Sequence, residues 1–281
     1  MQAVKSLDLK VSKGMVFGIL GPNGSGKTTT LGMLLGVIKP TAGTFAWFEN
    51  GQKDVNRKRI GAMLETPNFY PYLNAERNLR IVAKIKEVDN AEERIAKVLK
   101  DVNLYERRKS KFRTFSLGMK QRLAIASALL NDPEVLLLDE PTNGLDPQGI
   151  AEIRNLIQGI SKQGKTILIA SHQLDEIEKI CTDVVIIQNG DVIRQSSVDN
   201  VVGQTRQIVV SAGGKDLRGM VAQIDGVKVN REKDGLLLLD ADTEVTTQSI
   251  NKFFFDQGVV LGEIREIKKS LEDQFLEITK S

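Results

Sequence analysis

Short apolar runs alternate with turn residues over the first 65 positions of the chain. Residues 7–11 (LDLKV) alternate between apolar and charged side chains, the period-two pattern of a half-buried strand. Residues 15–20 (MVFGIL) are almost all apolar, which predicts a fully buried strand, and residues 28–37 predict a helix. A further strand is expected at residues 43–47 (GTFAW).

Charged side chains become frequent between residues 66 and 130, and apolar residues there recur at helical spacing. Residues 90–93 (NAEE) have the spacing of a capping box at the start of one such helix. The pattern indicates a helical insertion.

Strands and helices alternate again between residues 131 and 200. Two apolar runs, residues 135–138 and 166–170, flank a predicted helix at 147–161. A strand, a helix and a strand at this spacing form a βαβ unit and therefore a parallel sheet. Residues 184–193 predict a hairpin that turns at Asn189-Gly190.

Residues 201–281 have a different pattern of apolar and polar positions, which predicts a small α+β domain. Its expected strands are residues 207–211, 236–240 and 259–261, and its expected helices are 215–224, 247–257 and 270–279. We therefore expect a core of residues 1–65 and 131–200, an insertion at 66–130 and an accessory domain at 201–281.

Composition narrows the class of protein. The 281 residues suit one large domain, or one large domain with a small satellite, and a net charge of +3 is too small to indicate nucleic-acid binding. The single cysteine, Cys181, excludes an internal disulfide and fits a reducing compartment. No apolar run reaches the roughly 18 residues of a membrane span, and the N-terminus lacks a signal-peptide pattern. We expect a cytoplasmic protein, or one held at a membrane through a partner.

Residues 21–28 (GPNGSGKT) fit the phosphate-loop pattern, between an apolar strand and a helix. Glycines let successive N–H groups converge on phosphate oxygens, and the helix N-terminus adds its dipole. Lys27 would reach the outer phosphates, and Thr28 can bind Mg²⁺. The alternative is a chance glycine turn; the dinucleotide pattern GxGxxG is not met. The candidate ATP-binding residues are Gly21, Pro22, Asn23, Gly24, Ser25, Gly26, Lys27, Thr28 and Thr29.

Two adjacent acids, Asp139 and Glu140, follow the apolar run at 135–138. Ligands of open parallel sheets bind beyond the carboxyl ends of the strands. Asp139 would then lie beside the phosphate loop and hold Mg²⁺, while Glu140 would polarise an attacking water. A solvated strand end is the alternative interpretation.

Three further motifs follow in order. Residues 115–122 (FSLGMKQR) contain a serine-glycine turn before a helix, residues 143–146 (NGLD) form a second turn, and His172 follows the strand at 166–170. Taken singly, these are an ordinary turn, an ordinary Asn-Gly pair and a lone structural histidine. Taken together with the phosphate loop, they make residues 1–200 resemble the ATP-binding cassette (ABC) family, the nucleotide-binding subunits of transporters.

The resemblance implies a fold and a mechanism. The expected fold is α/β: a P-loop NTPase core with a parallel sheet, an antiparallel β subdomain and a helical insertion, plus the small α+β C-terminal domain. Two subunits would pack head to tail around two ATP molecules and hydrolyse ATP to ADP and phosphate. Each ATP would be capped by Ser116 and Gly118 of the opposing chain, which Asp146 would align. His172 would contact the γ-phosphate or the attacking water.

The chain also departs from the family's usual pattern. Leu117 and Met119 differ from the common signature, and Glu65 stands where the family usually has a glutamine that senses Mg²⁺ and the γ-phosphate. We hypothesise that Glu65 binds Mg²⁺ and makes nucleotide binding more metal-dependent. These differences resemble the bacterial subgroup linked to peptide-antibiotic export and lantibiotic immunity. The family usually has an adenine-stacking aromatic upstream of the strand at residues 3–9, which this sequence does not include. Either the true start lies further upstream, or the adenine has a poorer platform.

The implied partners are a second cassette, as a homodimer or pseudo-dimer, and an integral membrane permease. Residues 69–72 (FYPY) at the head of the insertion either receive a short helix of the permease or pack beneath the insertion. The C-terminal segment 270–279 looks like the last helix of many single-cassette exporter ATPases. A soluble ABC-type ATPase without a transport role and a phosphate-loop kinase are the alternatives. The sequence does not specify a transported substrate.

Overall fold

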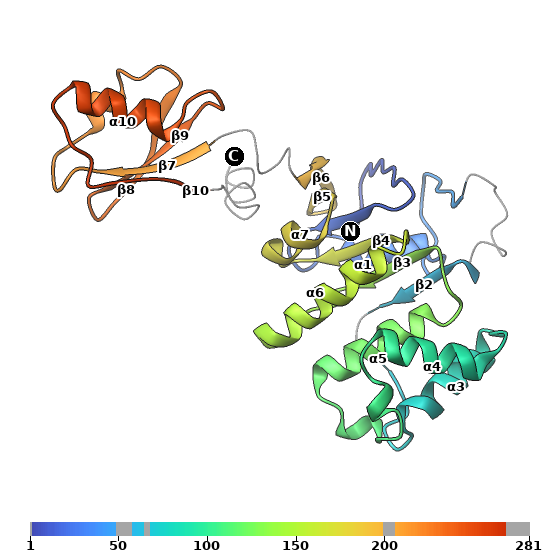
Figure 1. Cartoon of the computed structure of the whole chain (residues 1–281). Helices are drawn as coiled ribbons and strands as arrows, with labels where there is room; N and C mark the ends of the chain where they lie inside the picture. Colours follow the sequence, from blue (N-terminus) through green and yellow to red (C-terminus); the bar gives the residue numbers. More distant parts are fainter. Residues whose placement is uncertain (1, 49–57, 65–67, 199–205, 268–281) are drawn as a thin grey trace. The chain divides into compact units, whose positions relative to one another are not determined.

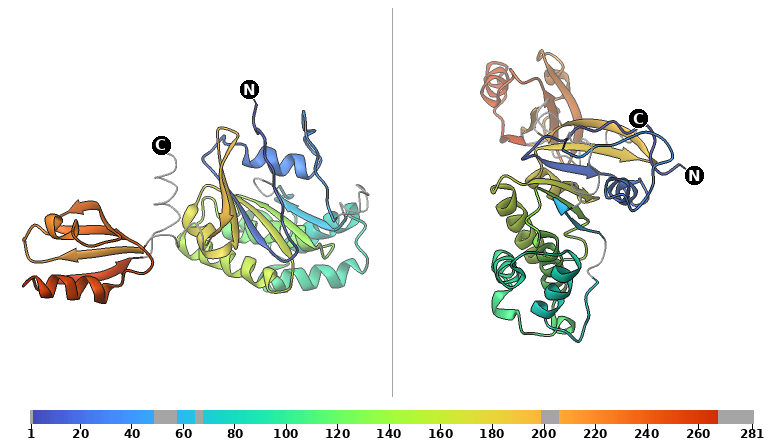
Figure 2. Two further views of the ribbon diagram at one scale, coloured as in Figure 1. Left: turned by 90° about the horizontal axis from the view of Figure 1, so that it is seen from above. Right: turned by 90° about the vertical axis from the view of Figure 1, so that its right-hand side faces the viewer.

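The computed structural model describes residues 2–48, 58–64, 68–198 and 206–267. Contacts divide the chain into two units, Met1–Gln195 and Ser196–Ser281, which are described one after the other. Figures 1 and 2 show the elements of each unit.

A six-stranded sheet in the order β2-β3-β4-β1-β5-β6 forms the centre of the first unit. Each neighbouring pair from β2 to β5 in this order is parallel. The last two strands, β5 and β6, are joined through Asn189 and Gly190, both with positive φ. The predicted βαβ unit is confirmed as β3, α6 (Pro147–Ser161) and β4. The strands are Val16–Leu20 (β1), Ile60–Met63 (β2), Val135–Asp139 (β3), Thr166–Ser171 (β4), Asp183–Gln188 (β5) and Asp191–Ser197 (β6).

Helices pack on both faces of this sheet. Leu31 of α1 (Lys27–Leu34) joins Phe17 and Ile19 of β1 in one apolar cluster. On the other face α7 (Leu174–Ile180) lies so close that a Cβ at Gly18 would be 2.8 Å from Ile177 Cγ2. Burial on both faces explains why β1, β3 and β4 are continuous apolar runs, as in other parallel sheets.

Three α-helices of the insertion contact one another at one end of the first unit (Figure 1). They are α3 (Ala75–Ile85), α4 (Ala91–Asp101) and α5 (Leu117–Leu129). The capping box predicted at residues 90–93 is wrong, because Asn90 has a left-handed backbone (φ 50°) and its side chain makes no capping hydrogen bond. Asn74 is the true cap in this region, since its side chain accepts a hydrogen bond from the Arg77 N–H at the start of α3.

Two predicted strands of the first unit are not formed. Residues 7–11 and 43–47 have no strand structure. Leu7, Leu9, Val11 and Trp47 instead pack against the apolar cluster beneath α1. Their alternation therefore reflects burial of every second side chain, and the antiparallel β subdomain lacks these two strands. The helix predicted at 28–37 ends at Leu34, where Gly36 with φ 71° lets the last turn close.

The second unit is built on a four-stranded antiparallel sheet in the order β10-β7-β9-β8. Helix α10 (Thr247–Asp256) covers one face of it (Figure 2), with Phe254 and Ile250 in a core that includes Ile208 and Leu239. The remaining elements are β7 (Arg206–Ser211), β8 (Val227–Lys233), β9 (Leu236–Ala241), β10 (Glu263–Ile267) and α9 (Arg218–Val221).

Three predictions for this unit need correction. Residues 259–261 are not a strand, and β10 begins later, at Glu263. The helix predicted at 215–224 is only the single turn α9. Strand β8 was not predicted, because six of its seven side chains are exposed and show no apolar alternation. The helix predicted at 270–279 lies outside the described residues.

None of the helices in the described segments combines the length and the apolar character needed to cross a membrane.

Candidate nucleotide-binding site

The glycine-rich loop between β1 and α1 has the backbone that its sequence predicts. Gly24 and Gly26 have φ angles of 80° and 109°, and Gly26 is the residue before the first turn of α1. A Cβ at Gly21 would lie 2.1 Å from the Ile187 carbonyl oxygen, so only glycine fits there. The loop thus leads into the N-terminus of α1, where unpaired N–H groups can bind an anion.

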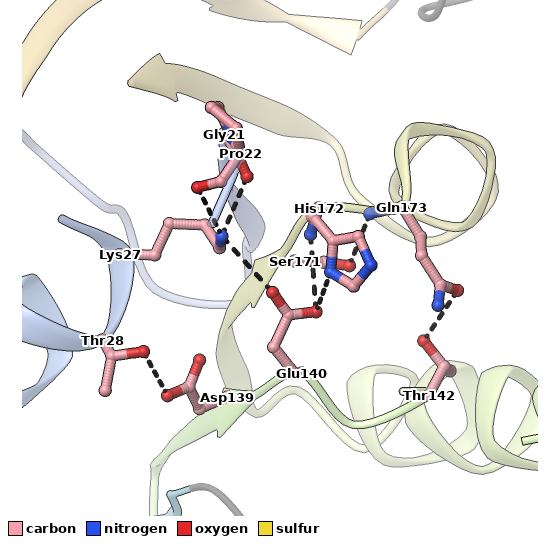
Figure 3. A network of polar contacts seen from close by, with 10 residues as sticks. All are labelled: Gly21, Pro22, Lys27, Thr28, Asp139, Glu140, Thr142, Ser171, His172 and Gln173. Carbon is pink, nitrogen blue, oxygen red and sulfur yellow. Dashed lines mark hydrogen bonds and ion pairs between the residues drawn. The ribbon is translucent and has the colours of Figure 1, made fainter. Parts of the chain in front are cut away.

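Lys27 is the buried cation of this loop. Its Nζ donates hydrogen bonds to the carbonyl oxygens of Gly21 (2.8 Å) and Pro22 (3.2 Å) (Figure 3). The same Nζ lies 3.4 Å from Glu140 Oε1, whose side chain is 20% exposed. The lysine therefore curls over the loop and brings its positive charge to the place where phosphates would lie.

Thr28 and Asp139 place two oxygen groups side by side. Thr28 is the second residue of α1 and Asp139 the last residue of β3, and Thr28 Oγ1 donates to Asp139 Oδ2 at 2.8 Å. A hydroxyl and a carboxylate are the hard oxygen ligands that Mg²⁺ accepts beside phosphate oxygens and water. Among the described residues no three His, Cys, Asp or Glu side chains gather as a metal site. Thr28 and Asp139 could supply two oxygen ligands to a Mg²⁺ ion whose other ligands are phosphate oxygens and water.

Glu140 lies between a lysine and a histidine. Its backbone is left-handed (φ 47°), and its N–H donates to the Ala170 carbonyl of the neighbouring strand at 2.9 Å. Oε1 faces Lys27, whereas Oε2 is 2.9 Å from His172 Nδ1 and 3.4 Å from the His172 backbone N (Figure 3). The carboxylate is thus oriented from both sides and partly open to solvent, as a general base requires.

The sequence reasoning missed a contact beside this group. Thr142 Oγ1 donates to Gln173 Oε1 at 3.3 Å, and the Gln173 N–H donates to Ser171 Oγ at 3.0 Å. These bonds tie the loop after β3 to the loop after β4, which carry Glu140 and His172. No motif marks Gln173, so only its position after His172 could have drawn attention to it.

Two of the remaining candidate residues, Ser116 and Asp146, are the N-terminal caps of helices α5 and α6. Ser116 caps α5 by accepting from the Met119 N–H (3.3 Å), and Asp146 caps α6 by accepting from the Gly149 N–H (3.0 Å). Ser116 and Asp146 are exposed. In the described part of the chain no hydrogen bond or ion pair joins Ser116, Gly118 or Asp146 to Lys27 or Glu140. Glu65 lies outside the described residues.

Comparison with known proteins decides the family. The profile of the family described as ABC transporter matches residues 4–143. The bacitracin transport ATP-binding protein BcrA of Bacillus licheniformis is 40% identical over 285 aligned positions, which cover 99% of this chain and 92% of BcrA. The chain belongs to the ABC transporter family.

The other similarities agree with membership of the ABC transporter family. The lantibiotic transport ATP-binding protein SrtF of Streptococcus pyogenes is 38% identical over 70% of this chain and 85% of its own length. A dimeric ATP-binding cassette, MJ0796, in a post-hydrolysis state with ADP and Pi, is 27% identical, has a TM-score of 0.62, and covers 70% of this chain and 90% of its own. The protein is therefore an ATP-binding subunit and an ATPase with the expected α/β P-loop NTPase fold.

Proposed function

We propose that this protein is the ATPase subunit of an exporter, and that it works through a separate integral membrane permease on the cytoplasmic face of the membrane. The transport of bacitracin and a lantibiotic by systems containing BcrA and SrtF supports an antibiotic, peptide or lipid-like substrate. The observation that carries the enzymatic part is the position of Glu140 between Lys27 and His172 at the end of β3.

ATP binds to the phosphate loop in this proposal. The backbone N–H groups from Gly21 to Thr29 surround the phosphates, and Lys27 supplies positive charge to the outer ones. Thr28 and Asp139 would hold Mg²⁺, which would neutralise charge on the phosphate oxygens. The 2.8 Å contact between these two side chains supports their joint role.

Hydrolysis is assigned to Glu140 and His172. The Glu140 carboxylate accepts a proton from the attacking water, while His172 contacts the γ-phosphate or that water. The 2.9 Å contact of His172 Nδ1 with Glu140 Oε2 keeps the imidazole beside the base. Its second ring nitrogen is then the one that faces the substrate.

Two copies of the cassette close on ATP. Ser116, Gly118 and the N-terminus of α5 in one copy cap the γ-phosphate that is held by the other copy, and Asp146 aligns the two. The exposed position of Ser116 and Asp146 at helix starts supports contacts made outside their own chain. MJ0796, which is dimeric, provides a precedent for such a pair.

The Glu140→Gln variant tests this mechanism. It should bind ATP and lose hydrolysis by about 10²–10⁴-fold, because the general base is gone. With ATP and Mg²⁺ it should accumulate as a dimer, measured by size-exclusion chromatography with light scattering. The control is the same variant with ADP. A Glu140→Gln protein that stays monomeric with ATP and Mg²⁺ at every concentration would exclude closure around ATP.

Tyr70 and Tyr72 are the proposed contact with the permease. Phe69 packs against Phe112, with the ring centroids 5.2 Å apart. In contrast, Tyr70 and Tyr72 are 50% and 65% exposed. Two exposed aromatic side chains at the head of the insertion suit an interface. Co-purification of the protein with an integral membrane protein supports transport, and loss of that complex in Tyr70→Ser/Tyr72→Ser locates the contact. A complex that persists in the double variant would move the interface elsewhere, and a protein without any membrane partner would favour a non-transport ATPase.

The role of Glu65 stays a hypothesis. As a carboxylate in place of glutamine, it is proposed to bind Mg²⁺ directly and to repel phosphate when the metal is absent. The Glu65→Gln variant should therefore reduce the Mg²⁺ dependence of ATP binding. An unchanged Mg²⁺ titration would refute the idea.

A further inference from the structure

Helices α5 and α6 each begin at a residue that is assigned to the opposing ATP site. Ser116 caps α5 and Asp146 caps α6. A second pair of residues lies six positions farther along each helix, Arg122 on α5 and Glu152 on α6. Arg122 Nη2 and Glu152 Oε2 are 3.5 Å apart, so an ion pair joins the two helices at matching depth.

The starts of the two helices also touch. A Cβ at Gly144 would lie 3.2 Å from Leu117 Cδ2, and a Cβ at Gly118 would lie 3.8 Å from Leu145 Cδ2. The turn before α6 therefore packs against the first turn of α5. One contact alone would let the helices rotate about it, whereas a second contact farther along fixes their relative orientation.

Arg122 contacts the end of α4 as well as Glu152. Its side chain is only 17% exposed, and Nη1 lies 3.5 Å from the Val102 carbonyl and 3.4 Å from the Asn103 carbonyl, just after α4. Glu152 in turn accepts a hydrogen bond from Gln148 Nε2 at 3.1 Å. Each member of the ion pair therefore has a further contact that helps to orient its side chain.

The space beside this pair is not filled by packed side chains. A cavity of about 510 Å³ lies there, lined by residues of α4, α5 and α6 that include Arg122 and Glu152. The ion pair therefore borders an open space, and the Glu152 side chain is 42% exposed.

We propose that Arg122 and Glu152 are positioning residues that hold the starts of α5 and α6 in register. Ser116, Gly118 and Asp146 then meet the opposing subunit as one preformed surface, and less ordering is required when the dimer closes. This inference rests on the proposed closure of two cassettes around ATP. Neither Arg122 nor Glu152 is assigned a contact with nucleotide.

The test compares Glu140→Gln with Glu140→Gln/Glu152→Gln. The second protein should need about fivefold or more ATP for half-maximal dimer formation with Mg²⁺, because its capping surface must be ordered during closure. Its affinity for ADP as a monomer should stay within about twofold, because the phosphate loop is not changed. An Arg122→Lys substitution added to Glu140→Gln should weaken dimer formation too, and the triple variant should be no weaker than the worse of the two, as expected for one shared link.

The matched control is Glu92→Gln in the same Glu140→Gln background. It breaks the 2.6 Å ion pair between Arg80 and Glu92, which joins α3 to α4 and does not involve α6. Dimer formation in this control should match the parent. The inference is overturned if Glu152→Gln dimerises like the parent, or if Glu92→Gln is equally impaired. If the Glu140→Gln parent itself does not dimerise, the closure mechanism and this inference fail together. If the parent dimerises and the Glu152 variant dimerises equally well, only this inference fails.

Discussion

Glu140 has a backbone that few residues other than glycine adopt, with φ of 47°. This conformation costs of order 1–3 kcal/mol, and the surrounding structure sustains it through the N–H bond to Ala170 and the ion pair with Lys27. The result is that the chain leaves β3 abruptly. Asp139 stays with Thr28, while its neighbour Glu140 turns toward Lys27 and His172. At the residue scale, one peptide unit thus separates two adjacent carboxylates into two environments.

Thr28→Ala should raise the Mg²⁺ concentration needed for half-maximal ATP hydrolysis by roughly tenfold or more. The reason is that the proposed metal site loses one oxygen ligand and Asp139 loses its 2.8 Å hydrogen-bond donor. Thr28→Ser is the matched control, because it keeps the hydroxyl group. A Mg²⁺ titration of ATPase activity checks this, and equal titrations for Thr28→Ala and the native protein would contradict it.

Cys181 should be almost unreactive in the native protein. Burial raises the pKa of its thiol, with a smaller effect from Asp183, and only 8% of the residue is exposed. Because thiolate is the nucleophile, labelling with iodoacetamide should stay slow between about pH 7 and 9, around the ordinary thiol pKa near 8.5. In denaturant the same residue should react faster as the pH rises through that range. Fast labelling of the folded protein would mean that the α7 region opens readily.

At the scale of elements, two asparagines that precede helices have different structural roles. Asn74 is extended (ψ 170°) and its side chain caps α3, whereas Asn90 is left-handed and caps nothing at α4. The extended backbone aims the side chain at the N–H groups of the first turn. The same residue type at the same position before a helix therefore does not imply the same stabilisation.

Asn74→Ala should lower the free energy of unfolding of the first unit by about 1 kcal/mol. Asn90→Ala removes no capping bond and should cost less. Asn90→Gly should be neutral or stabilising, since glycine accepts the positive φ without strain. Urea denaturation of the three variants makes the comparison, and equal losses for Asn74→Ala and Asn90→Ala would show that the cap contributes nothing.

At the scale of the whole molecule, each of the two units has its own apolar core. The second unit buries Ile208, Leu239, Ile250 and Phe254 between its sheet and α10. The predicted limits of the core, insertion and accessory domain, 1–65 with 131–200, 66–130 and 201–281, remain predictions, as does the part that the accessory domain plays in transport.

Phe254→Ala should destabilise the second unit by about 3–5 kcal/mol, because the ring is fully buried in that core. Phe255→Ala is the matched control: the neighbouring ring is 70% exposed, and its loss should change stability by less than about 0.5 kcal/mol. Calorimetry of the full chain should show one lowered transition for Phe254→Ala, with ADP binding retained at temperatures below it. A uniform shift of all transitions would mean that the units unfold together.

The sequence by itself determined the features whose causes lie within a few residues. Continuous apolar runs predicted β1, β3 and β4, because strands buried on both faces need apolar side chains at every position. The pattern of residues 21–28 predicted a loop that Gly24 and Gly26 form with positive φ, because glycine adopts this conformation without strain. The family resemblance, which the comparisons confirmed, also followed from short motifs in order.

Only the tertiary structure decided features that depend on distant residues. Strand β8 is almost entirely exposed and exists through its pairing with β9, whereas residues 7–11 alternate like a strand and form none. Glu140 contacts Lys27 and His172, and Arg122 contacts Glu152. The members of each pair are 30 or more positions apart in the sequence, and only the folded chain brings them together. Hydrophobic periodicity reports which side chains are buried. It does not report which backbone groups pair or which charges meet, because those energies are set by the partner and not by the segment itself.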